Sequence, residues 1–163
     1  MTLPAIKQEI GKIEYLFSLI DSVQRERGIP FALATAAAAH LTQYTCVRVA
    51  GFIEQAVREI YRAYALGRAG QSPLTRFVSA ALERQQNLNA ERLCQLAGRF
   101  DSKWEADLRV FMDEERKEAL ASILRNRHKI AHGDAVSLGV VQMKDWYKRA
   151  VEVVAFLEEQ AGS

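Results

Sequence analysis

The sequence is poor in residues that interrupt helices or cross-link chains. Its 163 residues include nine Gly and three Pro, the two residue types that most disfavour a helix interior. The two cysteines, Cys46 and Cys94, are too few for a disulfide framework, so we expect small buried thiols in a reducing compartment. No basic segment precedes an apolar run at the N-terminus, and no stretch reaches the roughly 18 uncharged apolar residues of a membrane span. These absences predict an all-α, cytoplasmic protein that has no membrane segment.

The length and the net charge of the chain limit the number of domains and the classes of function that can be expected. The chain is long enough for one domain with a core and short for two, so residues 1–163 are predicted to form a single domain. The net charge of +2 is too small to indicate nucleic-acid binding from bulk charge. Any such function must therefore depend on a local cluster of charge.

Apolar residues recur every three or four positions in the first half of the chain, which indicates amphipathic helices. The first predicted helix begins at Pro4 and ends near Gly28. The second extends from about residue 31 to 66 and ends at the following glycines, with Gly51 as a point where it could bend. Within it, Glu54 is placed on the solvated face in an i, i+4 ion pair with Arg58. A pairing of Glu54 with an arginine of the later motif is the alternative.

In the second half of the chain, the sequence pattern predicts shorter helices. These cover residues 73–86, residues 90–97, and a segment that starts at Asp101 or Ser102 and includes Phe111. Residues 87–89 form a turn. Asp113 then caps a helix that continues to Gly133, residues 134–141 form a loop, and the last helix covers about residues 144–160.

The end of the penultimate predicted helix carries a charge pattern that packing does not require. Within two helical turns it holds three cations, Arg125, Arg127 and Lys129, and two of the three histidines, His128 and His132, with no acid among them. Cations suit the negative pole of a helix, but that effect is worth only about 0.3–1 kcal/mol per charge and does not require two histidines. Cations beside imidazoles indicate a phosphate-bearing partner and proton transfer at that phosphate.

The string Asn-Arg-His-Lys-Ile-Ala-His-Gly at residues 126–133 resembles the signature of the HEPN superfamily, most closely that of its RiboL-PSP-type branch. In that signature an Arg is followed by a polar residue and then by a His near the end of a late helix. Here Arg127 precedes His128, and His132 completes an Arg-x4-His spacing. The resemblance implies a HEPN-like helical bundle with long early helices, a motif-bearing penultimate helix, and a homodimer in which the two motif helices face each other.

The resemblance also implies a function. Many such proteins are metal-independent endoribonucleases of toxin–antitoxin or antiviral defence systems, so we expect RNA as the substrate, no cofactor or metal, and an antitoxin or other protein as a further partner. RNA supplies its own nucleophile, the 2′-OH. His132 is then the candidate general acid or base, and Arg127 the candidate phosphate ligand. The alternatives are a catalytically silent HEPN module for dimerisation or binding, and a helical bundle with no nucleic-acid role.

Helix geometry leaves the pairing of arginine and histidine open. On an ideal helix Arg127 and His132 lie about 140° apart, whereas Arg125 and His128 share the face of His132. The helix could fray before His132, the site could be composite across a dimer, or Arg125 could be the functional arginine. The residue pattern of the motif favours Arg127 as the functional arginine, with Arg125 as the alternative. Asn126 and His128 are candidate supporting polar groups.

Overall fold

The computed structural model describes residues 2–162, which form helices joined by short loops and turns. No strand occurs among these residues, so the all-α prediction is confirmed. In chain order the helices are α1 (Pro4–Arg25), α2 (Phe31–Ala69), α3 (Pro73–Glu83), α4 (Ala90–Gly98), α5 (Ser102–Phe111), α6 (Glu114–Ala131) and α7 (Val140–Gly162).

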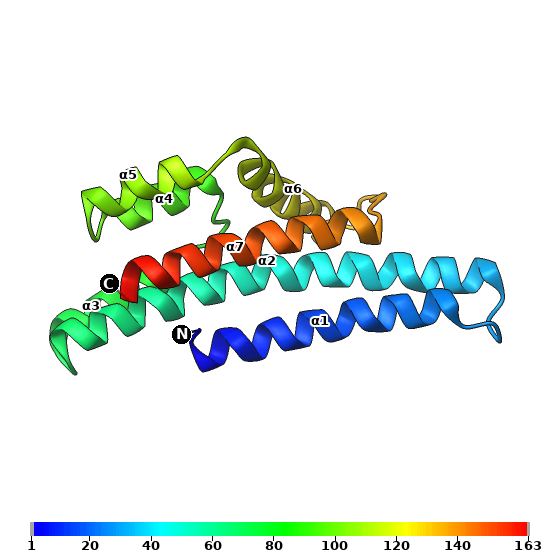
Figure 1. Ribbon diagram of the computed structural model, residues 1–163, viewed down its shortest axis with the longest axis horizontal. Helices are drawn as coiled ribbons and strands as arrows, with labels where there is room; N and C mark the ends of the chain where they lie inside the picture. The colour runs from blue at the N-terminus through cyan, green and yellow to red at the C-terminus, as the bar shows by residue number, and fades with distance from the viewer. Residues whose placement is uncertain (1, 163) are drawn as a thin grey trace.

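The long helix α2 is the central element of the bundle. Helices α1, α3, α6 and α7 all pack against it. Figure 1 shows α1, α2 and α7 with their long axes nearly aligned, while α4 and α5 form a pair above one end. The two termini meet at that same end, and the N–H of Leu3 donates a hydrogen bond of 2.7 Å to Glu158 of α7. This aligned layer is the platform on which α6 lies.

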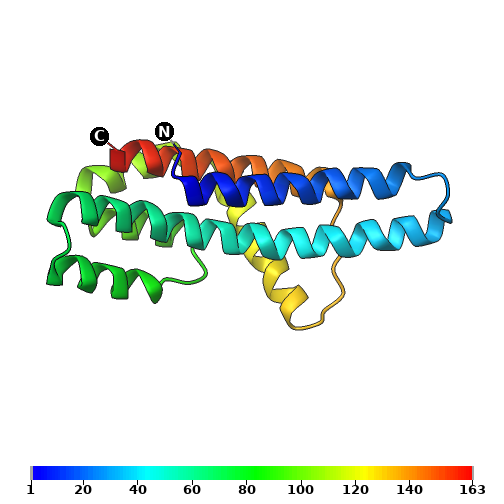
Figure 2. The same cartoon turned by 90° about the horizontal axis from the view of Figure 1, so that it is seen from below.

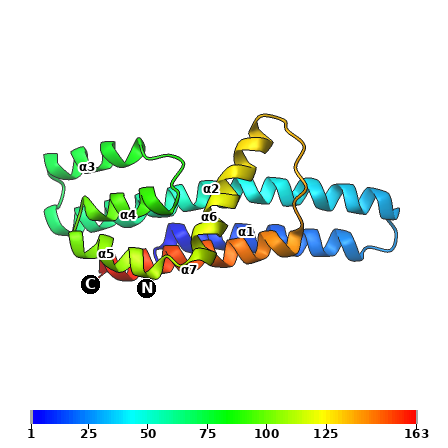
Figure 3. The same ribbon diagram turned by 90° about the horizontal axis from the view of Figure 1, so that it is seen from above.

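Helix α6 crosses the bundle and is fixed over its first turns. Leu120 and Ile123 are fully buried in the core, and the Cys46 thiol of α2 donates to the carbonyl of Ile123 (3.6 Å). An ion pair of 2.8 Å between Arg116 and Glu152 joins α6 to α7. The C-terminal end of α6 then projects beyond α2, as Figures 2 and 3 show. The predicted motif therefore lies on a protruding helix end whose base is packed into the core.

The helix boundaries differ from the sequence predictions in several places. Helix α2 continues without interruption past Gly51, with Ala50 and Phe52 on either side of it packed into the core, and it ends only at Gly70, whose φ is +57°. Helix α3 ends at Glu83 rather than at residue 86. The largest error concerns Val140, which begins α7 instead of lying in a loop.

The early start of α7 follows from burial. Val140 packs against the core, and Met143 one turn later is completely buried. The N–H of Met143 donates to the carbonyl of Gly139 (3.0 Å), which forms the first turn of the helix. The β-branched character of the Val140–Val141 pair favours extended structure only weakly, and side-chain packing overrides it.

Candidate functional site

The end of α6 is a well-defined helix stop. His132 is the C-cap residue and keeps a helical backbone conformation (φ −90°, ψ 0°), and its N–H donates to the carbonyl of His128 (3.1 Å). Gly133 has a φ of +75°. Its N–H bonds to the Ile130 carbonyl (3.1 Å), and the N–H of Asp134 bonds to the Lys129 carbonyl (2.9 Å). This pair of bonds is the Schellman arrangement, for which a left-handed glycine is best suited.

The two motif histidines lie side by side at this helix end. The ring centroids of His128 and His132 are 4.3 Å apart, with the ring planes inclined by 64°. Both side chains are exposed. Although the α-helix ends at Ala131, the helical conformation of His132 keeps its ring on the face of His128. Fraying of the helix before His132, one of the three alternatives for bringing an arginine and His132 together, is therefore not observed.

Arg127 lies in a different environment, in contact with α2 and with the loop between α3 and α4. Its Nη1 donates to Oδ1 of Asn87 (2.8 Å) and lies 3.8 Å from Oε1 of Glu54. The same Glu54 oxygen accepts the backbone N–H of Asn87 (2.8 Å). The Arg127 side chain remains 36% exposed, while that of Glu54 is 11% exposed. The guanidinium is thus positioned by two polar partners and still reaches solvent.

The position of Glu54 corrects the sequence prediction. It was expected on the solvated face of α2 in an ion pair with Arg58, and the alternative partner, an arginine of the motif, is the one observed. Its face of α2 is covered by α6 and by the loop after α3. A carboxylate in such a place requires hydrogen bonds and a counter-charge, which Asn87 and Arg127 supply.

The remaining predicted site residues have separate partners. Arg125, on the histidine face of the ideal helix, is exposed and lies 3.4 Å from the Glu118 carboxylate. A hydrogen bond from Ser122 and the charge of Arg125 lower the pKa of that carboxyl group. The amide of Asn126 donates to the Ser122 carbonyl within α6 (2.8 Å), so it supports the helix. Among the described residues, no hydrogen bond or ion pair joins Arg127 to either histidine.

Asn87 is the functional candidate that sequence reasoning missed. It was expected only as part of a turn, and the structure places it between α2 and α6 with a φ of +53°. Asn is one of the few non-glycine residues that tolerate this left-handed conformation. An Asn-Leu-Asn sequence between two helices signals such a turn, but nothing local shows that the Asn87 side chain reaches Arg127.

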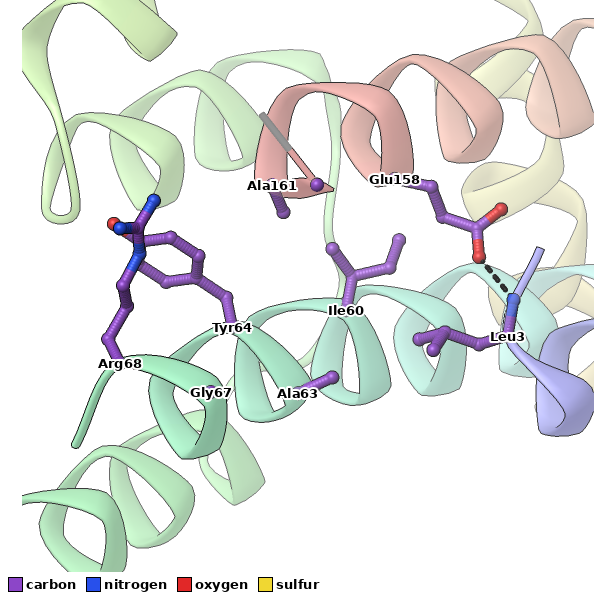
Figure 4. A pocket seen from close by; sticks show the side chains of 9 residues that line it. Leu3, Ile60, Ala63, Tyr64, Gly67, Arg68, Glu158 and Ala161 are labelled. Carbon is purple, nitrogen blue, oxygen red and sulfur yellow. Dashed lines mark hydrogen bonds between the residues drawn. The ribbon is translucent and has the colours of Figure 1, made fainter. Parts of the chain in front are cut away.

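Outside the motif, two further features carry reactive or polar groups: the buried thiol of Cys46 and a pocket at one end of the bundle. Burial raises the pKa of the Cys46 thiol to about 11, so it is no nucleophile at neutral pH. A pocket of about 440 Å³ lies where the ends of α2 and α7 meet. Figure 4 shows Glu158 there, bonded to the N–H of Leu3, and Arg68 beside Tyr64. Residues 2–162 contain no group of three or more His, Cys, Asp or Glu side chains arranged to hold a metal ion.

Comparison with known families decides the identity of the fold. A family model described as RiboL-PSP-HEPN matches residues 6–163, which include the motif and all helices beyond the start of α1. The chain belongs to the RiboL-PSP type of HEPN domain. No curated protein and no solved structure gave a match. The predicted HEPN-like bundle is thereby confirmed, and no helix in the described part of this HEPN domain is long and apolar enough to cross a membrane.

Proposed function

We propose that this HEPN protein is a metal-independent endoribonuclease that acts as a homodimer. The observation that supports this is the helix end of α6, where a positioned, partly exposed arginine lies on the same protruding segment as two exposed histidines. Domains of this family often cleave or bind RNA and often dimerise. The proposal uses Arg127 and His132 as the principal catalytic groups.

The chemistry requires only proton transfer and charge stabilisation. His132 takes the proton of an RNA 2′-OH, and the 2′ oxygen then forms a bond to the adjacent phosphorus. The P–O5′ bond breaks, the 5′ oxygen takes up a proton from water, and a 2′,3′-cyclic phosphate remains, while His132 returns its proton to the solvent. The Arg127 guanidinium binds the non-bridging oxygens, where negative charge accumulates in the transition state. A guanidinium already held by Asn87 needs little reorganisation at that step.

The site is proposed to be composite. Within one chain Arg127 contacts Asn87 and Glu54, while the imidazoles of His128 and His132 lie on another face. Because the end of α6 projects from the bundle (Figure 3), a second copy can approach it. In this arrangement Arg127 of one chain and the partner's His132 act on one phosphate. Arg125, on the histidine face, is the alternative arginine for a site contained within a single chain.

The first experiment is an RNA cleavage assay in EDTA that compares wild type with His132→Ala and analyses the product ends. We expect wild type to leave cyclic phosphate ends and the variant to lose about 100-fold or more in rate, the usual contribution of a general acid or base. Because His132 is exposed, the variant should retain its fold, which circular dichroism checks. Wild-type rates from folded His132→Ala would refute its assigned role.

Mixing inactive variants then tests whether the site is composite. When Arg127→Ala and His132→Ala are mixed and allowed to exchange subunits, half of the dimers are heterodimers. A composite site predicts one intact site in each heterodimer, and so about a quarter of wild-type activity for a symmetric dimer. A site within one chain predicts no recovery. The same mixture with Arg125→Ala in place of Arg127→Ala tests the alternative arginine.

A catalytically silent binding module is the second candidate, and one observation favours it. Arg127 is already bonded to Asn87 and lies near the Glu54 carboxylate, so its charge is partly satisfied within the chain. This module would dimerise or bind a protein or nucleic acid through α6. It predicts folded, dimeric wild type that cleaves none of a varied set of RNAs and in which the His132 ring is shielded from solvent.

We further propose that the enzyme acts in the cytoplasm as part of a toxin–antitoxin or antiviral defence system, with an antitoxin or other protein as its partner. The supporting argument is that an unregulated ribonuclease is harmful to its host. Expression of wild type in a bacterial host should then arrest growth, and expression of His132→Ala should not. Equal growth of the two strains at equal protein levels would count against this role.

A further inference from the structure

A small cationic pocket lies between the C-terminal end of α3 and one side of α4. Its volume is about 180 Å³, and its lining contains three arginines, Arg84, Arg92 and Arg99, and three glutamines. No carboxylate belongs to the lining. Pockets for drug-sized molecules measure about 300–1,000 Å³, so this one suits a smaller group, such as a phosphate.

The positive charge of this pocket is not neutralised within the chain. Among the described residues, Arg84, Arg92 and Arg99 form no ion pair, although acids are close in sequence. The nearby Glu91 is instead bonded to Arg109, at 2.8 Å and 2.9 Å. Three exposed guanidiniums without counter-charge repel one another, and this cost is relieved when an anion binds.

The pocket is physically linked to the candidate active site. Arg92 Nη1 donates to the carbonyl oxygens of Gln86 (3.0 Å) and Asn87 (3.4 Å), and Arg127 Nη1 donates to the side-chain oxygen of the same Asn87 (2.8 Å). A single residue, Asn87, therefore contacts both Arg92 of the pocket and Arg127 of the candidate active site. Figure 3 shows the loop between α3 and α4 facing α6. A continuous chain of phosphates could contact the arginine pocket and Arg127 together.

We propose that this pocket is a subsite for the phosphodiester backbone of single-stranded RNA, and that it holds a phosphate that flanks the one bound by Arg127. The choice of RNA as ligand rests on the proposed function. Guanidiniums bind phosphate oxygens in a bidentate manner, and the glutamine amides in the lining offer hydrogen bonds to sugar and base edges. The pocket would thus set the position of the strand before cleavage.

The test measures binding, by fluorescence anisotropy, of a single-stranded, fully 2′-O-methylated oligonucleotide, which lacks the attacking hydroxyl. The decisive variant is Arg84→Gln with Arg99→Gln. Arg92 is left unchanged because it also holds the loop that carries Asn87. The matched control is Arg25→Gln with Arg27→Gln, two exposed arginines at and just beyond the C-terminal end of α1, which changes the net charge equally. That end of α1 lies at the opposite end of the bundle from α4 (Figure 1).

We expect the pocket variant to weaken binding about tenfold and to reduce the slope of log affinity against log salt by about 0.7, since the pocket holds one phosphate and each lost single-strand phosphate contact contributes about 0.7. The control should change affinity less than about twofold. Equal losses in both variants, or none in the pocket variant, would overturn the subsite. Polyglutamate that binds wild type as tightly as the oligonucleotide would assign the pocket to an acidic protein instead.

Because the oligonucleotide cannot be cleaved, the result does not depend on catalysis. If wild type fails to cleave RNA but the pocket variant still loses affinity, the proposed activity fails and the subsite stands. If wild type cleaves RNA and the pocket variant binds the oligonucleotide normally, the subsite fails and the activity stands.

Discussion

The cluster of Glu54, Asn87 and Arg127 allows a quantitative test of how the motif arginine is held. Glu54→Gln preserves an oxygen that can accept the Asn87 N–H and removes the charge that faces Arg127. Glu54→Ala removes both. The two variants therefore separate the ion pair from the hydrogen bond, and both can be measured without any assumption about activity.

The expected magnitude follows from distance and exposure. The Glu54 and Arg127 atoms are 3.8 Å apart, and the two side chains are 11% and 36% exposed. Fully exposed pairs contribute about 0.2–1 kcal/mol, and breaking a fully buried pair costs about 3–5 kcal/mol. For this half-exposed arginine we expect Glu54→Gln to cost about 1 kcal/mol. Glu54→Ala should cost about 2–3 kcal/mol, because the Asn87 N–H also loses its acceptor.

Chemical denaturation followed by circular dichroism measures these free energies of unfolding. A double-mutant cycle of Glu54→Gln with Arg127→Gln isolates the coupling energy, which we expect to be about 1 kcal/mol. All variants are compared at one protein concentration, since dimerisation would make stability concentration-dependent.

The exposed pair Glu118 and Arg125, 3.4 Å apart, is the matched control. Its cycle should give less than about 0.5 kcal/mol. Coupling near zero at Glu54, or equal coupling in the two cycles, would refute the conclusion that burial of Glu54 fixes the guanidinium.

Three further predictions concern the stability of the helical bundle that carries the site. Ile123→Ala should lower the free energy of unfolding by about 3 kcal/mol, since Ile123 is fully buried, while Val110→Ala, at 86% exposure, should change it by less than about 0.5 kcal/mol. Burial raises the pKa of Cys46 from 9.0 to about 11, so the folded state holds the thiol proton more tightly than the unfolded state does. The resulting stabilisation is complete below pH 9 and is lost as the pH rises to 11. The free energy of unfolding should therefore fall by about 2 kcal/mol more over that interval in wild type than in Cys46→Ala. Gly133→Ala should destabilise by about 1 kcal/mol through its left-handed backbone, and Gly51→Ala, in an open helical position, should stabilise by about 0.5–1 kcal/mol; thermal unfolding that shows the same sign for both glycines would contradict this.

The order of the helices was predictable because their end signals are local. The hydroxyl of Ser72 accepts the N–H of Thr75 (3.3 Å), and the carboxylate of Asp113 accepts the N–H of Arg116 (2.9 Å), as expected of N-cap residues. Gly133 ends α6 with a positive φ. Each of these contacts spans only a few residues, so a reader of the sequence can place them before any tertiary structure is known.

Burial could not be predicted in the same way. Glu54 has the charge and spacing of a surface residue and becomes buried only because α6 and the loop after α3 cover it. Val140 has the character of a loop or strand residue and joins α7 because it packs on the core. In both cases a contact distant in sequence outweighs the local preference.

The sequence by itself determined which helices form and which chemical groups occupy the end of α6, because capping, periodicity and the composition of the motif depend on neighbouring residues. Only the tertiary structure decided how those groups are arranged. It directed Arg127 to Asn87, 40 positions away in the chain, whereas the contact of His128 with His132 already follows from their i, i+4 spacing on one helix. The physical reason is that a helix presents its side chains around its whole circumference, and the elements packed against it decide which of them are held and which remain free.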